Sequence, residues 1–217
     1  MAQRKLGLWL IGAKGGVATT VTVGLAALRK ELTESVGLVS ELPQFKGLDF
    51  ARWSDFTLGG HEIRQTTCFA AAQQLVQNNH ALDANLVGQL KLDLDKIDKN
   101  ICSGTLSNVG QTIENLADPA VRKVREAPLA TIDRLQSDLK SFVRKNHLDQ
   151  LIVVNLASTE PPLEGELPAR WKDLAKLLDK KKIRLEEWSE LCVLCLTLAL
   201  SASGSAGVGN VISIAPR

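Results

Sequence analysis

The sequence predicts an α/β protein built on a doubly wound parallel sheet of the Rossmann type. An apolar run at residues 6–11 is followed by a glycine-rich turn and then by a helical pattern. A second run, LIVVN at 151–155, is also apolar and β-branched, and the segments between the two runs show helical periodicity. Strands that alternate with helices favour a parallel sheet, because each parallel connection needs a crossover long enough to hold a helix.

The N-terminal stretch predicts a strand and a helix in direct succession. Leu6–Ile11 is too short for a helix and ends at Gly12, so it is interpreted as a buried strand. Gly24 is expected to allow close backbone approach in the helix that follows. That helix is predicted from an apolar stripe with spacings of four, four, three and four residues, namely Val17, Val21, Leu25, Leu28 and Leu32.

Glycines between this strand and helix indicate a phosphate-binding turn. Gly12, Gly15 and Gly16 permit a sharp bend, after which the first amides of the helix face an anion. With Ala18 they form the pattern G-x-x-G-x-x-A, a variant of the dinucleotide-binding turn. The alternative pattern KGGVATT, from Lys14, is typical of partition-type ATPases but lacks their phosphate-binding lysine before the threonines. A strand-to-helix turn without a ligand is the third interpretation.

The next segments predict a strand followed by a loop. Val36–Ser40 is interpreted as a strand, and Glu41 behind it as either a ribose-binding carboxylate or a solvated turn residue. Pro43–Asp55 is predicted to be a loop that its aromatic side chains fix to the body of the protein. These side chains are Phe45, Phe50 and Trp53.

The run Phe56–Arg64 is interpreted as a strand whose end opens onto a ligand crevice. Gly59 and Gly60 would let the backbone approach a ligand there, whereas His61 is expected to be a hydrogen-bonded structural residue.

Three helical segments are predicted in the rest of the chain. They cover 66–79, capped by Thr66 or Thr67, then 82–101, as a helix or a loop-helix excursion that covers the sheet, and finally the stretch from Pro128 to Leu148. Residues 102–110 are predicted to form a loop. Leu151–Asn155 is then a buried strand, whose carboxyl end would place Asn155, Ser158 and Thr159 at the same sheet edge as the glycine turn.

Composition excludes several classes of function. The 217 residues carry 26 Lys and Arg against 24 Asp and Glu, so no overall charge attracts nucleic acid or an anionic membrane. Four cysteines without a secretory signal favour free thiols in a reducing cytoplasm. The acidic residues Asp93, Asp95 and Asp98 alternate with leucines and lysines, which favours a solvated helix face over a metal site. We therefore predict a cytoplasmic protein without bound metal.

Three stretches together resemble the myo-inositol-phosphate synthase family, also called inositol-3-phosphate synthase. They are LWLIGAKGGVATTVTVGLAALR at 8–29, GGHEIR at 59–64 and VVNLASTEPP at 153–162, in the order found in the family. The resemblance covers roughly residues 5–165. It implies a Rossmann-like domain that binds NAD, and an isomerase that converts D-glucose 6-phosphate to myo-inositol phosphate with the same cofactor.

The resemblance also implies particular cofactor contacts. The glycine turn of the family, which holds the pyrophosphate, falls on Gly12, Ala13, Lys14, Gly15, Gly16 and Val17. The carboxylate behind the strand-end glycines falls on Glu62, which would bind the adenosine ribose better than Glu41. The segment on the nicotinamide side falls on Asn155, Ala157, Ser158 and Thr159.

The C-terminal part departs from the family pattern. Family members continue into a second domain with a catalytic lysine motif, and this sequence has no counterpart to it, so no catalytic residue is assigned. We expect an NAD-binding domain at 1–165 and a helical segment at 166–217, the start of a truncated or divergent second part. In that segment Cys192 and Cys195 are expected to pack in an apolar helix. A non-catalytic NAD-binding regulatory module is the alternative function, and a homo-oligomer is compatible with either.

Overall fold

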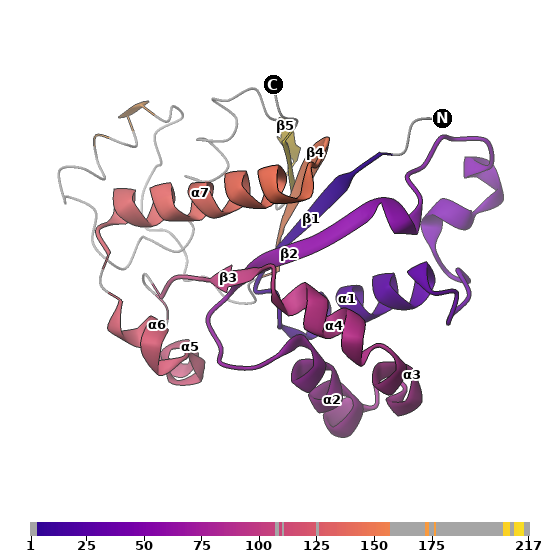
Figure 1. The fold of residues 1–217 in the computed structure, drawn as a ribbon, viewed down its shortest axis with the longest axis horizontal. Coiled ribbons are helices and arrows are strands. Elements are labelled where there is room, and N and C mark those ends of the chain that lie inside the picture. The colour runs from indigo at the N-terminus through magenta and orange to yellow at the C-terminus, as the bar shows by residue number, and fades with distance from the viewer. Residues whose placement is uncertain are drawn as a thin grey trace.

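The structure is built around a mainly parallel sheet. It is a computed structural model and describes residues 4–106, 109, 111–124, 126–156, 172, 173, 176, 206–208 and 211–214. Four parallel strands lie in the order β3-β2-β1-β4 (Figure 1). They are β1 (Leu6–Ile11), β2 (Phe56–Glu62), β3 (Ile101–Ser103) and β4 (Gln150–Asn155). Beyond β4, the antiparallel strands β6 (Val211–Ile214) and β5 (Ala206–Val208) extend the sheet.

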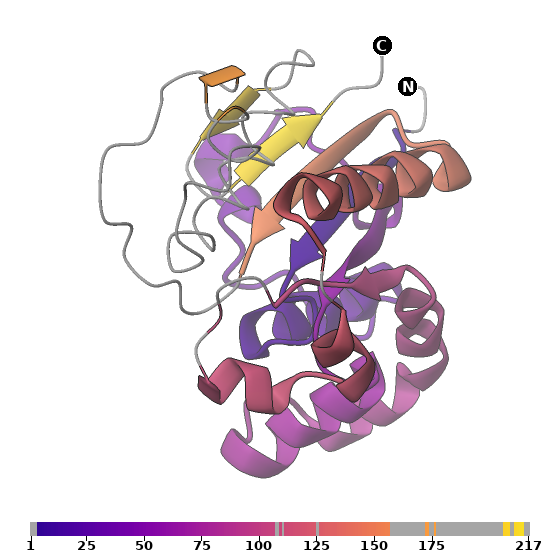
Figure 2. The same cartoon turned by 90° about the vertical axis from the view of Figure 1, so that its left-hand side faces the viewer.

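Helices cover both faces of this sheet (Figures 1 and 2). One face carries α1 (Gly16–Arg29), α2 (Cys68–Asn79), α3 (Ala84–Gln89) and α4 (Lys91–Asp98), whereas α7 (Pro128–Asn146) covers the other. The chain steps from β1 to β2 to β3 and then returns past β1 to β4. Because parallel crossovers are right-handed, this reversal moves the connecting helix to the opposite face. The predicted doubly wound α/β class is therefore confirmed.

Short elements complete the connections between the main strands and helices. Between α1 and β2 the chain makes three 3-10 turns, η1 (Val39–Glu41), η2 (Pro43–Phe45) and η3 (Trp53–Asp55). Between β3 and α7 it forms α5 (Gln111–Leu116) and α6 (Pro119–Lys123). No helix among the described residues is long and apolar enough to cross a membrane.

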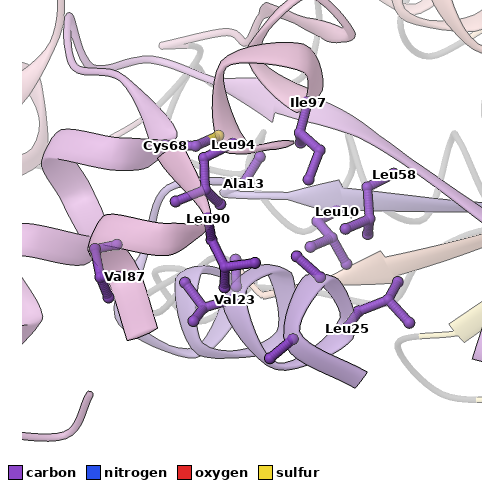
Figure 3. Close-up of a cluster of buried hydrophobic side chains, with 14 residues drawn as sticks. Leu10, Ala13, Val23, Leu25, Leu58, Cys68, Val87, Leu90, Leu94 and Ile97 are labelled. Atoms are coloured by element: carbon purple, nitrogen blue, oxygen red, sulfur yellow. The ribbon is translucent and has the colours of Figure 1, made fainter. Parts of the chain in front are cut away.

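Alternate residues of each strand enter two separate cores, as the period of a strand requires. The first core lies between the sheet and α1 to α4 and includes Leu10, Leu58, Leu90 and Leu94 (Figure 3). The second lies under α7 and is built from Trp9, Leu135, Leu139, Phe142, Leu148, Leu151 and Val153. The helix predicted after Pro128 is thus confirmed, and its apolar side chains face the sheet.

The apolar stripe predicted for α1 is buried only in part, since Leu25 lies in the first core at 8% exposure but the stripe's first residues do not. Val17 is 64% exposed and Val21 38% exposed, whereas small residues such as Ala18, Thr22 and Ala26 face the sheet. Small side chains let the helix lie close to the strands, a geometry that an apolar stripe alone does not reveal. Gly24 is not a point of close approach either, since a Cβ there would have no neighbour within 4 Å.

The strand predicted at Val36–Ser40 is also wrong. Gly37 has φ 87°, which breaks an extended conformation, and Val36 is 83% exposed. The strand next to β1 is β2 instead, with Leu6 opposite Phe56. In the loop before β2, Trp53 packs on the first core as predicted, but Phe50 is half-exposed and pairs with Phe45.

The helix predicted at 66–79 is confirmed as α2, whereas the short helices α5 and α6 were not predicted, and β5 and β6 are strands within the segment 166–217 that was expected to be helical. Thr67 caps α2 by accepting a hydrogen bond from the Ala70 amide at 3.0 Å. The predicted helix at 82–101 is divided into α3 and α4. The predicted loop at 102–110 begins inside β3, which is only three residues long and carries no clear alternation.

Candidate functional site

The turn between β1 and α1 is fastened to the end of β2. The carbonyl of His61 accepts hydrogen bonds from the amides of Gly12 (3.0 Å) and Ala13 (3.1 Å), and the Gly15 amide donates to the Gly12 carbonyl (2.9 Å). Gly12 has φ 79°, a backbone conformation that residues other than glycine rarely adopt. The turn is therefore held in one shape by the neighbouring strand.

The first turn of α1 offers unoccupied donors. The Thr19 amide donates to the Gly15 carbonyl at 2.8 Å, but no described residue accepts from the amides of Gly16, Val17 or Ala18. Gly15 supplies no side-chain cap, and the first turn holds no acidic residue. Free amides and the positive end of the helix dipole make this point suitable for an anion.

Glu62, the last residue of β2, is bound into the turn. Its side chain is 5% exposed. One carboxylate oxygen accepts from the Lys14 amide at 2.7 Å, and the other accepts from the amides of Ile63 (2.9 Å) and Arg64 (3.1 Å). The guanidinium of Arg64 lies 3.4 Å from the carboxylate and donates to the Lys14 carbonyl. The predicted contact of Glu62 with a ribose stays a prediction.

The charge of Lys14 is neutralised inside the protein. Its ammonium group lies 3.0 Å from the carboxylate of Asp98 and donates to the Thr66 carbonyl. Asp98 also accepts from the Cys68 amide at 2.9 Å, at the start of α2. Burial and the nearby Asp98 raise the pKa of the Cys68 thiol to about 12. Asp98 is thus a tertiary anchor and not a residue of a solvated face, and a role of Lys14 at an ATP phosphate is disfavoured.

His61 links the turn to α7 through its side chain. The Trp9 indole donates to Nδ1 at 3.0 Å, so the proton of the neutral ring lies on Nε2 and points to Asp138 at 3.1 Å. Burial lowers the pKa of His61 against the opposing effect of Asp138. The side chain is hydrogen-bonded as predicted, and it ties β1, β2 and α7 together.

The glycine pair before His61 serves close packing. A Cβ on Gly60 would lie 2.3 Å from the Leu10 carbonyl oxygen and 2.6 Å from the Ala13 Cβ. On Gly59 it would lie 2.8 Å from the Phe142 ring and 2.9 Å from the Trp9 ring. The prediction that these glycines leave space for a ligand is wrong, because protein atoms fill the space on both sides of the sheet.

Asn155 is the predicted nicotinamide-side residue that the structure describes. It lies opposite Ile11 in the parallel register, and the next amide, that of Leu156, donates to the Ile11 carbonyl at 3.0 Å. Asn155 is therefore next to the glycine turn at the carboxyl edge, as predicted. The predicted site residues Ala157, Ser158 and Thr159 lie outside the described residues, as do Cys192 and Cys195.

A groove adjoins the turn, and the described residues near it form no metal site. An open groove of about 410 Å³ begins at Gly16 and Val17 and runs between α1 and α2, which explains why Val17 and Val21 are exposed. Within the described part of the chain, no three His, Cys, Asp or Glu side chains gather into a group able to hold a metal ion.

Sequence reasoning missed three residues that shape this site: Arg64, Asp98 and Asp138. Arg64 follows Glu62 by two residues, and this close spacing of an acidic and a basic residue was the only sequence signal that the two side chains could pair. Asp98 and Asp138 lie on helices far from the turn in sequence, at separations that no local pattern spans.

Comparisons with known proteins agree with this geometry. A family model of an NAD-binding domain, described as myo-inositol-1-phosphate synthase, matches residues 6–186. The solved inositol-3-phosphate synthase from Caenorhabditis elegans is similar, with TM-score 0.72 and 15% identity, covering 94% of this chain and 43% of that one. No protein of curated function matches the sequence.

A second solved structure, a myo-inositol-1-phosphate synthase-related protein from Thermotoga maritima, has TM-score 0.54 and 20% identity and covers 94% of this chain and 47% of that one. At these identities the likeness shows a common fold, and the chain spans less than half the length of either structure. The family model matches most of the chain. The protein therefore belongs to the myo-inositol-1-phosphate synthase family and contains its NAD-binding domain.

Proposed function

We propose that this chain binds NAD with the pyrophosphate on the free amides of Gly16, Val17 and Ala18. The observation that carries the proposal is this set of unpartnered donors at the carboxyl edge of a parallel sheet, where doubly wound folds bind their ligands. Membership of a family with an NAD-binding domain supports the choice of cofactor.

The small residues of the turn fit the requirements of a dinucleotide. The first glycine must make a tight turn, and Gly12 does so with φ 79°. The third small residue must let the helix pack on the sheet, and Ala18 is 1% exposed. At Gly16 a Cβ would meet only Leu75 among the described residues, at 3.8 Å, so the backbone at the start of α1 is open to close approach.

A bound NAD would supply the reversible hydride transfer that the family reaction on the sugar phosphate needs. We assign to this chain the cofactor-binding part of an inositol-3-phosphate synthase-like protein that acts on glucose 6-phosphate. Asn155 and the segment Ala157, Ser158 and Thr159 are proposed to lie on the nicotinamide side. Support for this position is the pairing of β4 with β1, which brings the end of β4 beside the turn.

The test compares the same substitution at two glycines of α1. Gly16→Val would add a side chain beside the amides proposed to hold the pyrophosphate, while Gly24→Val would add one near the middle of the helix, where a Cβ has no neighbour within 4 Å among the described residues. We expect Gly16→Val to weaken NAD binding at least about tenfold, roughly 1.4 kcal/mol, in isothermal titration calorimetry. Gly24→Val should keep the wild-type affinity.

Circular dichroism before each titration shows whether both variants are folded. Equal NAD affinities for folded Gly16→Val and wild type would overturn the proposed position of the pyrophosphate.

A further inference from the structure

We propose that Arg64, and not Glu62, faces the adenosine ribose, so that the site accepts a dinucleotide with a 2′-phosphate, NADP, as well as NAD. The inference rests on the proposed function and specifies the cofactor class of the same site. It follows from how the two side chains are held at the end of β2.

The carboxylate of Glu62 has little capacity left for a ribose diol. An ionised carboxylate offers about four lone-pair positions. Three backbone amides, those of Lys14, Ile63 and Arg64, donate to its two oxygens at 2.7 to 3.1 Å, and Arg64 Nε and Nη2 approach at 3.4 Å. With 5% of its side chain exposed, Glu62 acts as a positioning residue that closes the glycine turn.

Arg64 has donors to spare at the same edge. Its side chain is 27% exposed, five times the fraction of Glu62. Nε and Nη2 are directed to Glu62 and to the Lys14 carbonyl, whereas no described residue accepts from Nη1. A guanidinium carries five N–H donors in a fixed plane, so one edge remains for an outside acceptor.

The consequence concerns the choice between NAD and NADP. In NAD-specific Rossmann domains a free carboxylate at the end of the second strand binds the 2′-hydroxyl and repels a 2′-phosphate. An arginine near the same position accommodates the 2′-phosphate. Here the carboxylate is enclosed. Arg64 is itself paired with Glu62 but is 27% exposed and keeps its Nη1 donors, whereas Lys14, the other cation of the turn, is 10% exposed and paired with Asp98. The 2′-phosphate would therefore meet a cation.

The experiment measures dissociation constants of NAD and NADP for the 217-residue chain and its variants by calorimetry. We expect wild type to bind NADP within about tenfold of NAD. Arg64→Gln should raise the dissociation constant of NADP at least about fivefold more than that of NAD, and Arg64→Lys should recover part of the difference. Arg29→Gln is the control for net charge, because Arg29 is an exposed residue in the last turn of α1.

Glu62→Gln supplies an independent readout. If Glu62 shapes the turn, both dinucleotides should weaken by the same factor, while Glu41→Gln, at an exposed carboxylate, leaves both unchanged. A selective loss of NAD with preserved or improved NADP binding in Glu62→Gln would show that Glu62 contacts the ribose, and would overturn the inference.

Two other outcomes also decide. Equal loss of NAD and NADP affinity in Arg64→Gln would give Arg64 a purely structural role and overturn the inference while leaving the proposed function intact. Failure of the folded wild-type chain to bind either dinucleotide would overturn the proposed function itself.

Discussion

His61 shows how one buried residue serves two purposes at this site. Its carbonyl holds the amides of Gly12 and Ala13, and its ring bridges Trp9 and Asp138. A protonated ring would lose the hydrogen bond from Trp9, because Nδ1 would become a donor that faces another donor. The fold therefore favours the neutral ring, which agrees with the lowered pKa of His61.

This preference predicts a pH dependence of stability. Because burial holds the folded-state pKa of His61 below the ordinary value of 6.5, the unfolded chain binds more protons just below pH 6.5. The contribution is complete above about pH 6.5 and is lost as the pH falls from there to the folded-state pKa. Urea unfolding between pH 5 and 8 should show a declining free energy of unfolding at the acid end, and His61→Gln should reduce this decline.

The matched control is His80→Asn, at the exposed left-handed C-cap of α2, where asparagine is well tolerated. An identical acid decline in wild type and His61→Gln would contradict the role given to the buried imidazole.

At the scale of elements, the sequence predicted best where local pattern and tertiary environment agree. The unit from β1 through the glycine turn to α1 was predicted because an apolar run, three glycines and a helical period occur in direct succession. The buried face of α1 was not, since small residues facing a sheet carry little hydrophobic signal. The second strand was misplaced because VGLVS is apolar enough for a strand, while Phe56–Glu62 is weakened by a glycine pair that only the packing explains.

The same glycines allow a test of packing at two positions. Gly60→Ala places a Cβ 2.3 Å from the Leu10 carbonyl oxygen, a contact that requires backbone movement, so we expect a loss of about 1–3 kcal/mol or more in the free energy of unfolding. Gly24→Ala has open space in the middle of α1 and should gain about 0.5–1 kcal/mol. Urea denaturation of both variants measures the two changes. Changes of the same sign in the free energy of unfolding would contradict this account of packing at the two glycines.

At the scale of the whole molecule, much of the candidate site could be predicted only as a location. Parallel strands bring the ends of β1, β2 and β4 to one edge, so the glycine turn, Glu62 and Asn155 were expected together, and the structure places them there. The ion pair of Lys14 with Asp98 and the enclosure of Glu62 were not predicted, because they depend on side-chain directions that only the packed fold determines.

The most direct test of the central claim, that the turn at the start of α1 holds the cofactor, is a titration with NAD followed by amide resonances in nuclear magnetic resonance. The amides of Gly16, Val17 and Ala18 have no acceptor among the described residues and should accept the pyrophosphate as their partner. Their resonances should therefore shift furthest and saturate together, while those near the end of α1, at Arg29, stay in place. Saturable shifts confined to other parts of the chain, or no shift at any NAD concentration, would contradict the account.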